Sequence, residues 1–210
     1  RDACLDERIR QAPHQARAGE QREGRGELER LVEAGPDYAV AHHLLGTVYF
    51  HQGTLDLAIE RYERALELAP DFVLCSYDLG VAHYHRGDMP GAIAAHRRCL
   101  ELDPRYNAAH YRLAISLFHA GELDDAMEHF EQCTALTPEY LMARYHIGVI
   151  HERRDDLEAA AREFQRSVEE GVGEVSSLYH LARIRRAEGD DDEADRLLER
   201  ARQFAGSEAG

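Results

Sequence analysis

A pattern that returns every 34 residues is the feature of this sequence that most constrains its fold. If Ala39 is counted as position 1, position 8 carries a small residue in five successive copies: Gly46, Gly80, Ala114, Gly148 and Ala182. Position 20 carries alanine in every copy: Ala58, Ala92, Ala126, Ala160 and Ala194. A fixed period of this length predicts a solenoid, because each repeat can bury its apolar face only by stacking on its neighbours.

Each repeat is predicted to form two antiparallel helices. Positions 4, 7, 8 and 11 fall on one stripe, which is the spacing of a buried helix face. A glycine at position 15 suits the end of this first helix, and the acidic residue after it suits the start of the second. We expect first helices near positions 2–14 and second helices near positions 17–30. The alanine at position 20 lets the two helices approach closely. A larger side chain at position 24 fills the layer between repeats: Tyr62, His96, Phe130, Phe164 and Leu198.

These small, apolar and turn positions resemble the tetratricopeptide repeat (TPR), and the resemblance covers roughly Ala39 to Phe204. It implies an all-α fold, a right-handed α-solenoid of about five TPR helix-turn-helix units plus a degenerate N-terminal unit. The expected units are residues 39–72, 73–106, 107–140, 141–174 and 175–206, with a capping unit at 1–38 and a flexible tail at 207–210. Gly171-Val172-Gly173 replaces the closing proline of the fourth unit, so we expect the weakest joint there.

The charge balance and the cysteines narrow the range of functions. A net charge of −15 argues against a nucleic-acid or anionic-membrane partner, since either needs a basic surface. No apolar run is long enough to span a membrane. Cys99 and Cys133 replace alanine at position 27, and no CxxC motif is present, so buried thiols are expected. We expect a cytoplasmic protein, and because the chain begins at Arg1 rather than Met, a periplasmic location stays open.

No pattern indicates catalysis. The carboxylates lie along solvated helix faces, and no nucleophile–base pair, glycine-rich phosphate loop or His/Glu metal motif organises them. We therefore expect no enzyme activity, no cofactor and no metal site. All 25 basic residues are arginine. A GC-rich coding bias and adaptation to high salt are both open explanations for an acidic sequence without lysine.

The resemblance also implies where a ligand would bind. In the TPR family the first helices line a concave groove, and positions 2, 5, 9, 12 and 13 face it. Positions 5, 9, 12 and 13 are aromatic, apolar or histidine in the first three units apart from Thr47, and they include arginines in the last two. The candidate peptide-binding residues are His43, Thr47, Phe50, His51, Tyr77, Val81, Tyr84, His85, Tyr111, Ile115, Phe118, His119, Tyr145, Val149, Arg153, Tyr179, Arg183 and Arg186.

Such a groove predicts a protein–protein interaction scaffold or adaptor that binds a peptide segment. The expected partner carries apolar side chains toward the N-terminal units and an acidic group near Arg153, Arg183 and Arg186, which we expect to form a local positive patch. Tyrosine at position 5 is also a common family choice, and the arginines could equally be the solvated end of the array. Two alternatives stay open: a self-associating TPR scaffold, and the TPR segment of a larger enzyme or regulator.

Overall fold

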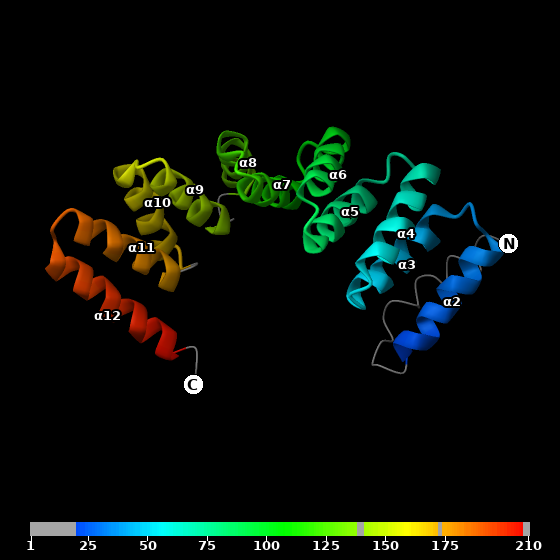
Figure 1. Ribbon diagram of the computed structural model, residues 1–210, viewed down its shortest axis with the longest axis horizontal. Helices are drawn as coiled ribbons and strands as arrows, with labels where there is room; N and C mark the ends of the chain where they lie inside the picture. Colours follow the sequence, from blue (N-terminus) through cyan, green and yellow to red (C-terminus); the bar gives the residue numbers. More distant parts are fainter. Residues whose placement is uncertain (1–19, 138–140, 172–173, 208–210) are drawn as a thin grey trace. The chain divides into compact units, whose positions relative to one another are not determined.

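The computed structural model describes residues 20–137, 141–171 and 174–207, and within these ranges it contains eleven helices and no strand (Figure 1). The first is α2 (Glu20–Ala34). The others follow as pairs: α3 (Ala39–His51) and α4 (Leu55–Leu68), α5 (Val73–Arg86) and α6 (Met89–Leu102), α7 (Asn107–Ala120) and α8 (Leu123–Leu136), α9 (Leu141–Arg153) and α10 (Leu157–Glu169), α11 (Glu174–Ala187) and α12 (Asp191–Ser207).

The helices begin where the repeat predicts. Every first helix starts within two residues of position 2, and every second helix starts at position 17. Because the same helix pair recurs with the 34-residue period, the expected all-α solenoid is confirmed. The division into a cap, five units and a tail stays a prediction, and residues 208–210 of the tail lie outside the described ranges.

The N-terminal region contains one described helix. α2 is longer than the second helix of the degenerate unit that the register places near residues 26–33. Its side chains Leu28, Leu31 and Val32 form a core cluster with Ala41 and Leu45 of α3. The first helix expected in this capping unit falls on residues outside the described ranges.

Small residues at position 8 are needed because a ring from position 24 lies directly against them. A Cβ atom added to Gly46 would lie 2.8 Å from the ring of Tyr62, and one added to Gly148 would lie 2.8 Å from the ring of Phe164. Contacts this short are not tolerated, so glycine lets the two helices of a repeat approach across an aromatic side chain. The alanines at position 20 are fully buried in all five repeats.

The turns inside the repeats share one backbone conformation. Gly53, Gly87, Gly121 and Gly189 at position 15 all have positive φ angles. The fourth repeat has no glycine there, yet Asp155 adopts the same left-handed conformation with φ 62°. Aspartate tolerates this region better than most residues, although less well than glycine. The turn is therefore set by the packing of the helix pair rather than by its own residue.

Three of the acidic residues after these turns, all aspartates, cap the second helices as predicted, whereas Glu122 makes no side-chain cap hydrogen bond. The carboxylate of Asp88 accepts a hydrogen bond from the amide of Gly91 at 3.1 Å. Asp156 and Asp190 accept equivalent bonds from the amides of Ala159 and Glu193, also at 3.1 Å. Each bond satisfies an amide that the helix itself leaves unpaired.

The cysteines at repeat positions are core residues. Cys75, Cys99 and Cys133 are buried free thiols, which agrees with the role expected from their positions. Burial raises the pKa of Cys75 and of Cys133 to about 12, so both stay protonated and unreactive at neutral pH. Cys4 lies outside the described residues.

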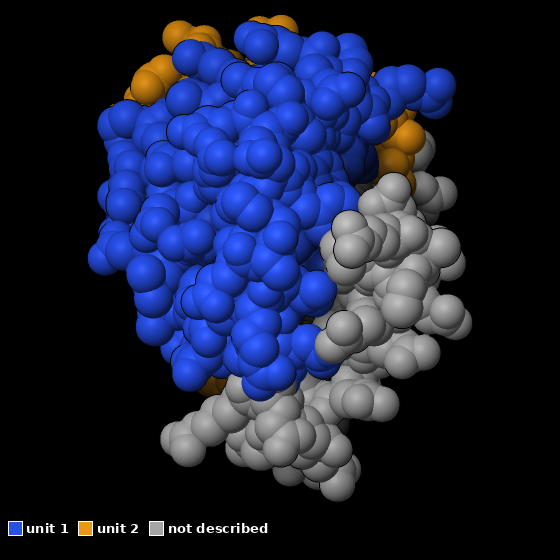
Figure 2. All heavy atoms as spheres, turned by 90° about the vertical axis from the view of Figure 1, so that its right-hand side faces the viewer, with its two compact units in different colours: residues 1–116 blue, residues 117–210 orange. Residues whose placement is uncertain are grey.

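The chain divides into two compact units, residues 1–116 (unit 1) and residues 117–210 (unit 2), coloured separately in Figure 2. The boundary falls inside α7, and each unit is described by itself below. Among the described helices, none combines the length and the apolar character needed to cross a bilayer.

Candidate functional site

In unit 1, the first candidate residue is part of the core rather than the surface. His43 is buried, and its Nε2 donates a hydrogen bond to the carboxylate of Asp78 at 2.7 Å. Its ring centroid lies 4.8 Å from that of Phe72. Asp78 follows position 5 of the next repeat, so this pair joins α3 to α5. His43 is therefore a packing residue, and its assignment to an open groove is corrected.

Next to it, an aromatic and histidine surface spans α3 and α5. The ring centroid of Phe50 lies 5.4 Å from that of His85 and 5.6 Å from that of His51. Tyr84 contacts His85 edge-on, with centroids 5.8 Å apart. His51 and His85 are exposed, while Phe50 and Tyr84 are half-buried. These candidates therefore contact one another, and their use as a binding surface stays a prediction.

The remaining candidates of unit 1 differ in accessibility. Tyr77 is half-buried, and its ring centroid lies 5.2 Å from that of Tyr106. Thr47, Val81 and Tyr111 are also half-buried. Ile115 is buried, so it supports the surface without being presented on it.

In unit 2, an arginine covers an aromatic candidate. The guanidinium carbon of Arg153 lies 4.0 Å from the ring centroid of Phe118, a cation–π contact. Phe118 is buried, whereas Arg153 and His119 are exposed. An incoming side chain therefore meets the arginine first, and Phe118 can be reached only if Arg153 moves.

A chain of four side chains connects α9 to α11. The hydroxyl of Tyr145 lies 3.3 Å from Nε2 of His180 and donates to it, while Nδ1 of His180 donates to Glu152 at 2.8 Å. Nε of Arg183 donates to the other oxygen of Glu152 at 3.2 Å. Burial and the nearby Glu152 raise the pKa of Tyr145, so its hydroxyl keeps the proton it donates.

Sequence reasoning missed the central member of this chain. His180 occupies position 6, directly after the tyrosine position, and was not a candidate. Its signal is the spacing: His180 follows Tyr145 by 35 residues, as Asp78 follows His43. Polar pairs between position 5 of one repeat and position 6 of the next are a feature that a sequence search could use.

The C-terminal arginines of unit 2 line a small hollow. A volume of about 300 Å³ is bounded by Tyr179, Arg183, Arg186 and Leu198. Arg186 pairs with Asp195 at 2.6 Å, and Arg183 pairs with Glu152. The two arginines are therefore present where expected, but each already has a carboxylate partner, so they are not the uncompensated positive patch that the sequence suggested.

The apolar side chains that stand out from the first helices are mostly at position 2. Val40, Leu74 and Met142 are 37%, 45% and 41% exposed, and Tyr179 at position 5 is 49% exposed. Position 2 was expected to face the groove, but its residues were left out of the candidate set. We use the term first-helix face, in each unit by itself, for these side chains together with the candidate residues of that unit that are not buried.

The histidines of this face do not converge. Among the residues that the structure describes, no three His, Cys, Asp or Glu side chains are arranged to hold a metal ion. His51 and His85 instead make edge contacts with aromatic rings. The face offers aromatic contact area, exposed aliphatic side chains and guanidinium groups, which is the chemistry of a binding surface.

Such a fold defines an α-helical repeat scaffold. Family models described as TPR repeat and tetratricopeptide repeat match residues 46–87, 77–140, 128–175 and 177–202. The chain therefore belongs to the tetratricopeptide repeat family, a family of protein–protein interaction scaffolds.

Solved structures support the same fold. The chain is similar to MamA from Desulfovibrio magneticus RS-1, with 20% identity, a TM-score of 0.77, and coverage of 83% of this chain and 98% of that one. PilF of Pseudomonas aeruginosa gives 19% identity, a TM-score of 0.78, and coverage of 98% and 94%. YrrB, described as a TPR protein with an unusual peptide-binding site, gives 17% identity, a TM-score of 0.71, and coverage of 83% and 90%. No curated protein sequence matches the chain.

Proposed function

We propose that this TPR scaffold binds a peptide segment of a partner protein on its first-helix face. The observation that carries the proposal is that the first helices of each unit expose large apolar side chains, most of all Leu74 in unit 1 and Tyr179 in unit 2. Exposed large apolar side chains of this kind are typical of interaction surfaces. The peptide-binding site named for YrrB is consistent with this use of the fold.

We infer that the peptide carries apolar side chains that pack on the face and an acidic group near Arg186. Buried aromatic and aliphatic anchors supply most of the energy of such interfaces. An acidic group would have to replace the existing partner of an arginine. The Arg186–Asp195 pair is open to solvent, with side chains 53% and 73% exposed, so exchanging its carboxylate costs little.

Arg183 is a poorer candidate for this exchange. Its partner Glu152 has a side chain only 10% exposed, and the same carboxylate accepts a hydrogen bond from His180. Removing Arg183 would leave a largely buried carboxylate with one partner fewer, which is costly. We therefore assign contact with the acidic group to Arg186 rather than to Arg183 in this proposal.

The test is selection of binding peptides from a random library on the purified chain, followed by affinity measurements on variants. We expect Leu74→Ala and Tyr179→Ala each to weaken a selected peptide about tenfold, because each removes a large contact. Leu57→Ala is the matched control, since Leu57 is 41% exposed but lies on the second helix α4. Equal binding by all three variants, or a loss confined to Leu57→Ala, would place the peptide elsewhere.

The arginine assignment has its own measurement. Arg186→Ala is expected to weaken a peptide with an acidic residue severalfold at low ionic strength and much less in high salt, because exposed charge pairs are screened. A peptide whose acidic residue is replaced by its amide should not respond to Arg186→Ala. If both peptides respond equally, the arginine acts through packing rather than charge.

A further inference from the structure

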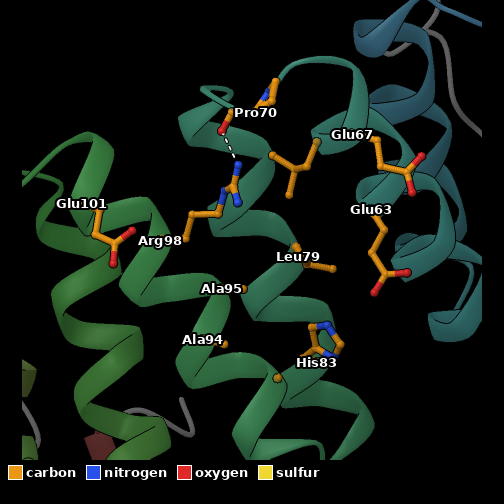
Figure 3. Close-up of a pocket in the computed structure, with 11 residues that line it drawn as sticks. Glu63, Glu67, Pro70, Leu79, His83, Ala94, Ala95, Arg98 and Glu101 are labelled. Atoms are coloured by element: carbon orange, nitrogen blue, oxygen red, sulfur yellow. Dashed lines mark hydrogen bonds between the residues drawn. The ribbon is translucent and has the colours of Figure 1, made fainter.

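A second surface of unit 1 is not part of the first-helix face. A hollow of about 800 Å³ lies between the second helices α4 and α6, with α5 between them as its floor (Figure 3). This volume is within the usual range of ligand-binding clefts. The residues that α5 contributes are Leu79 and His83.

These two residues lie on the side of α5 away from the candidate groove. Leu79 follows Tyr77 by two residues, and His83 follows Val81 by two. Two residues correspond to about 200° of rotation around an α-helix. Tyr77 and Val81 belong to the first-helix face, so a ligand in the hollow would not touch that face.

The hollow exists because α6 carries small residues where other second helices carry larger ones. Ala94 occupies position 22, where the other repeats have Glu60, Glu128, Arg162 and Arg196. Gly91 lies one turn before it, and an added Cβ atom there would meet both Asp88 and His83 at 2.5 Å. The side chains of Asp88 and His83, 2.8 Å apart, occupy the space that a side chain at position 91 would need, so only glycine fits there. Without a side chain at this position, α6 projects little into the hollow.

The floor is apolar and the rim is acidic. Leu66, Leu79 and Ala95 line the floor, and three glutamates, Glu63, Glu67 and Glu101, stand around it (Figure 3). These three floor residues belong to the core of unit 1 and are almost fully buried, so the bottom of the hollow is the surface of the core.

Arg98 is the arginine that lines the hollow, and its guanidinium is held by a neutral acceptor. Arg98 donates a hydrogen bond to the backbone carbonyl of Pro70 at 2.7 Å, as the dashed line in Figure 3 shows. Glu67 pairs with Arg64 at 2.8 Å. Within the described part of the chain, the structure gives Glu63 and Glu101 no cationic partner. Three glutamates and one arginine therefore line this hollow, so its rim carries a net negative charge.

We propose that this hollow, the α4–α6 groove, docks a basic amphipathic segment of a partner protein. Its lysine or arginine side chains would pair with Glu63 and Glu101, and an adjacent apolar side chain would pack on Leu66 and Leu79. The low wall at Ala94 lets the backbone of the segment come close. A cationic side chain at this rim gains attraction that the surrounding surface does not cancel.

Charge decides between this occupant and others. A second copy of the chain also carries a net charge of −15, so its approach is opposed by like charge. An anionic membrane or nucleic acid is repelled for the same reason. A protein segment that is basic and partly apolar complements both the rim and the floor.

The test uses a short fluorescein-labelled amphipathic peptide of lysine and leucine, titrated with the full chain at low ionic strength. A peptide with glutamate in place of lysine serves as the reference probe. We expect the lysine peptide to bind and the double variant Glu63→Gln, Glu101→Gln to weaken it at least tenfold. Ala94→Arg should abolish binding, since it fills the hollow and adds a positive charge. Arg162 and Arg196 show that arginine is accepted at this helix position.

A matched control separates docking from general attraction to an acidic protein. Glu131 and Glu169 occupy the same repeat positions as Glu63 and Glu101 but lie in unit 2, and both are exposed. The double variant Glu131→Gln, Glu169→Gln removes the same charge and should leave the affinity within twofold. Equal weakening by both double variants would overturn the proposal.

Further outcomes distinguish this groove from the other surfaces. Leu74→Ala should leave binding of the lysine peptide unchanged, and a loss there would move the peptide to the first-helix face. The proposal would also be overturned if the wild-type chain bound the lysine peptide no more tightly than the glutamate peptide. If the wild-type chain is a dimer in solution and the Ala94→Arg variant is a monomer, the groove binds a second copy instead. A melting curve of each variant confirms that it is folded.

Discussion

At the residue scale, position 24 of the repeat is occupied by side chains of different polarity. It is a ring or leucine in every repeat, but His96 is the one imidazole among them, and it is fully buried. Its ring lies against Gly80, as the ring of Phe164 lies against Gly148. Burial, with a smaller contribution from Arg112, lowers the pKa of His96 to about 3. The folded state therefore holds this side chain neutral, whereas the unfolded chain protonates it near pH 6.5.

This difference predicts a specific dependence of stability on pH. Below pH 6.5 the unfolded chain binds a proton at His96 that the folded chain does not, so the free energy of unfolding falls as the pH drops toward 3. The loss is about 1.4 kcal/mol per pH unit. The substitution His96→Phe removes this pH-dependent loss of stability, and it reproduces the Gly–Phe pair of the fourth repeat.

We expect His96→Phe to raise the free energy of unfolding by about 2 kcal/mol more at pH 5 than at pH 8, measured by urea denaturation at both pH values. His85→Phe is the control, because His85 is exposed on the first-helix face. A gain from His96→Phe that is the same at pH 5 and pH 8 would show that packing, not protonation, is responsible.

At the scale of the element, the turn between α9 and α10 departs from the other turns. Asp155 holds a left-handed backbone that glycine holds elsewhere, and this costs an L-residue roughly 1 kcal/mol. The same turn places Asp156 to cap α10. The helix pair thus imposes its geometry on a residue that does not favour it.

Asp155→Gly should therefore stabilise unit 2. The expected gain is up to about 1 kcal/mol, because the strain is relieved while glycine also loses more entropy on folding. The measurement is thermal or urea unfolding of the variant beside Glu128→Gly, which places glycine at an exposed position inside helix α8 and should destabilise by a similar amount. A loss of stability in Asp155→Gly would mean that the Asp155 side chain contributes more than its backbone costs.

At the scale of the whole molecule, stability depends on coupling between neighbouring repeats. The joint before α11 lacks the closing proline, and Gly171 ends α10 with φ 79°. Contacts nevertheless cross it: Phe164 and Val168 share a core cluster with Leu178, and Ser177 donates to Ser167 at 3.2 Å. The joint is therefore packed, and among the described helices the α11–α12 pair has one neighbouring repeat.

We expect the α11–α12 pair to exchange amide hydrogens faster than α3 to α6. Fewer neighbouring contacts have to be broken for a terminal pair to open. Hydrogen exchange followed by mass spectrometry measures this directly, and limited proteolysis should cut first near residues 170–174. Uniform protection along the described helices would show that the joint is as strong as the others.

The cellular location of the protein and its self-association stay predictions. Three buried, free thiols are compatible with the reducing cytoplasm that the composition suggests. Self-association would appear as a higher mass in solution, and it would compete with peptide binding if it used the first-helix face.

The sequence alone determined the repeat: its helix pairs, its turns, its caps and the small residues that meet large rings. These features are local or follow a strict period, so Gly46 and Tyr62 reveal their contact through their counterparts 34 residues away. Tertiary structure decided which side chains remain accessible. His43 is hydrogen-bonded to Asp78, Arg153 lies over the ring of Phe118, and Arg183 forms an ion pair with Glu152.

The hollow between α4 and α6 belongs to the same category, because it depends on Ala94 and Gly91 in one helix and on glutamates in another. Accessibility and ion pairing are set by side chains of neighbouring helices. The period places those side chains near one another, but their lengths and rotamers determine which of them meet.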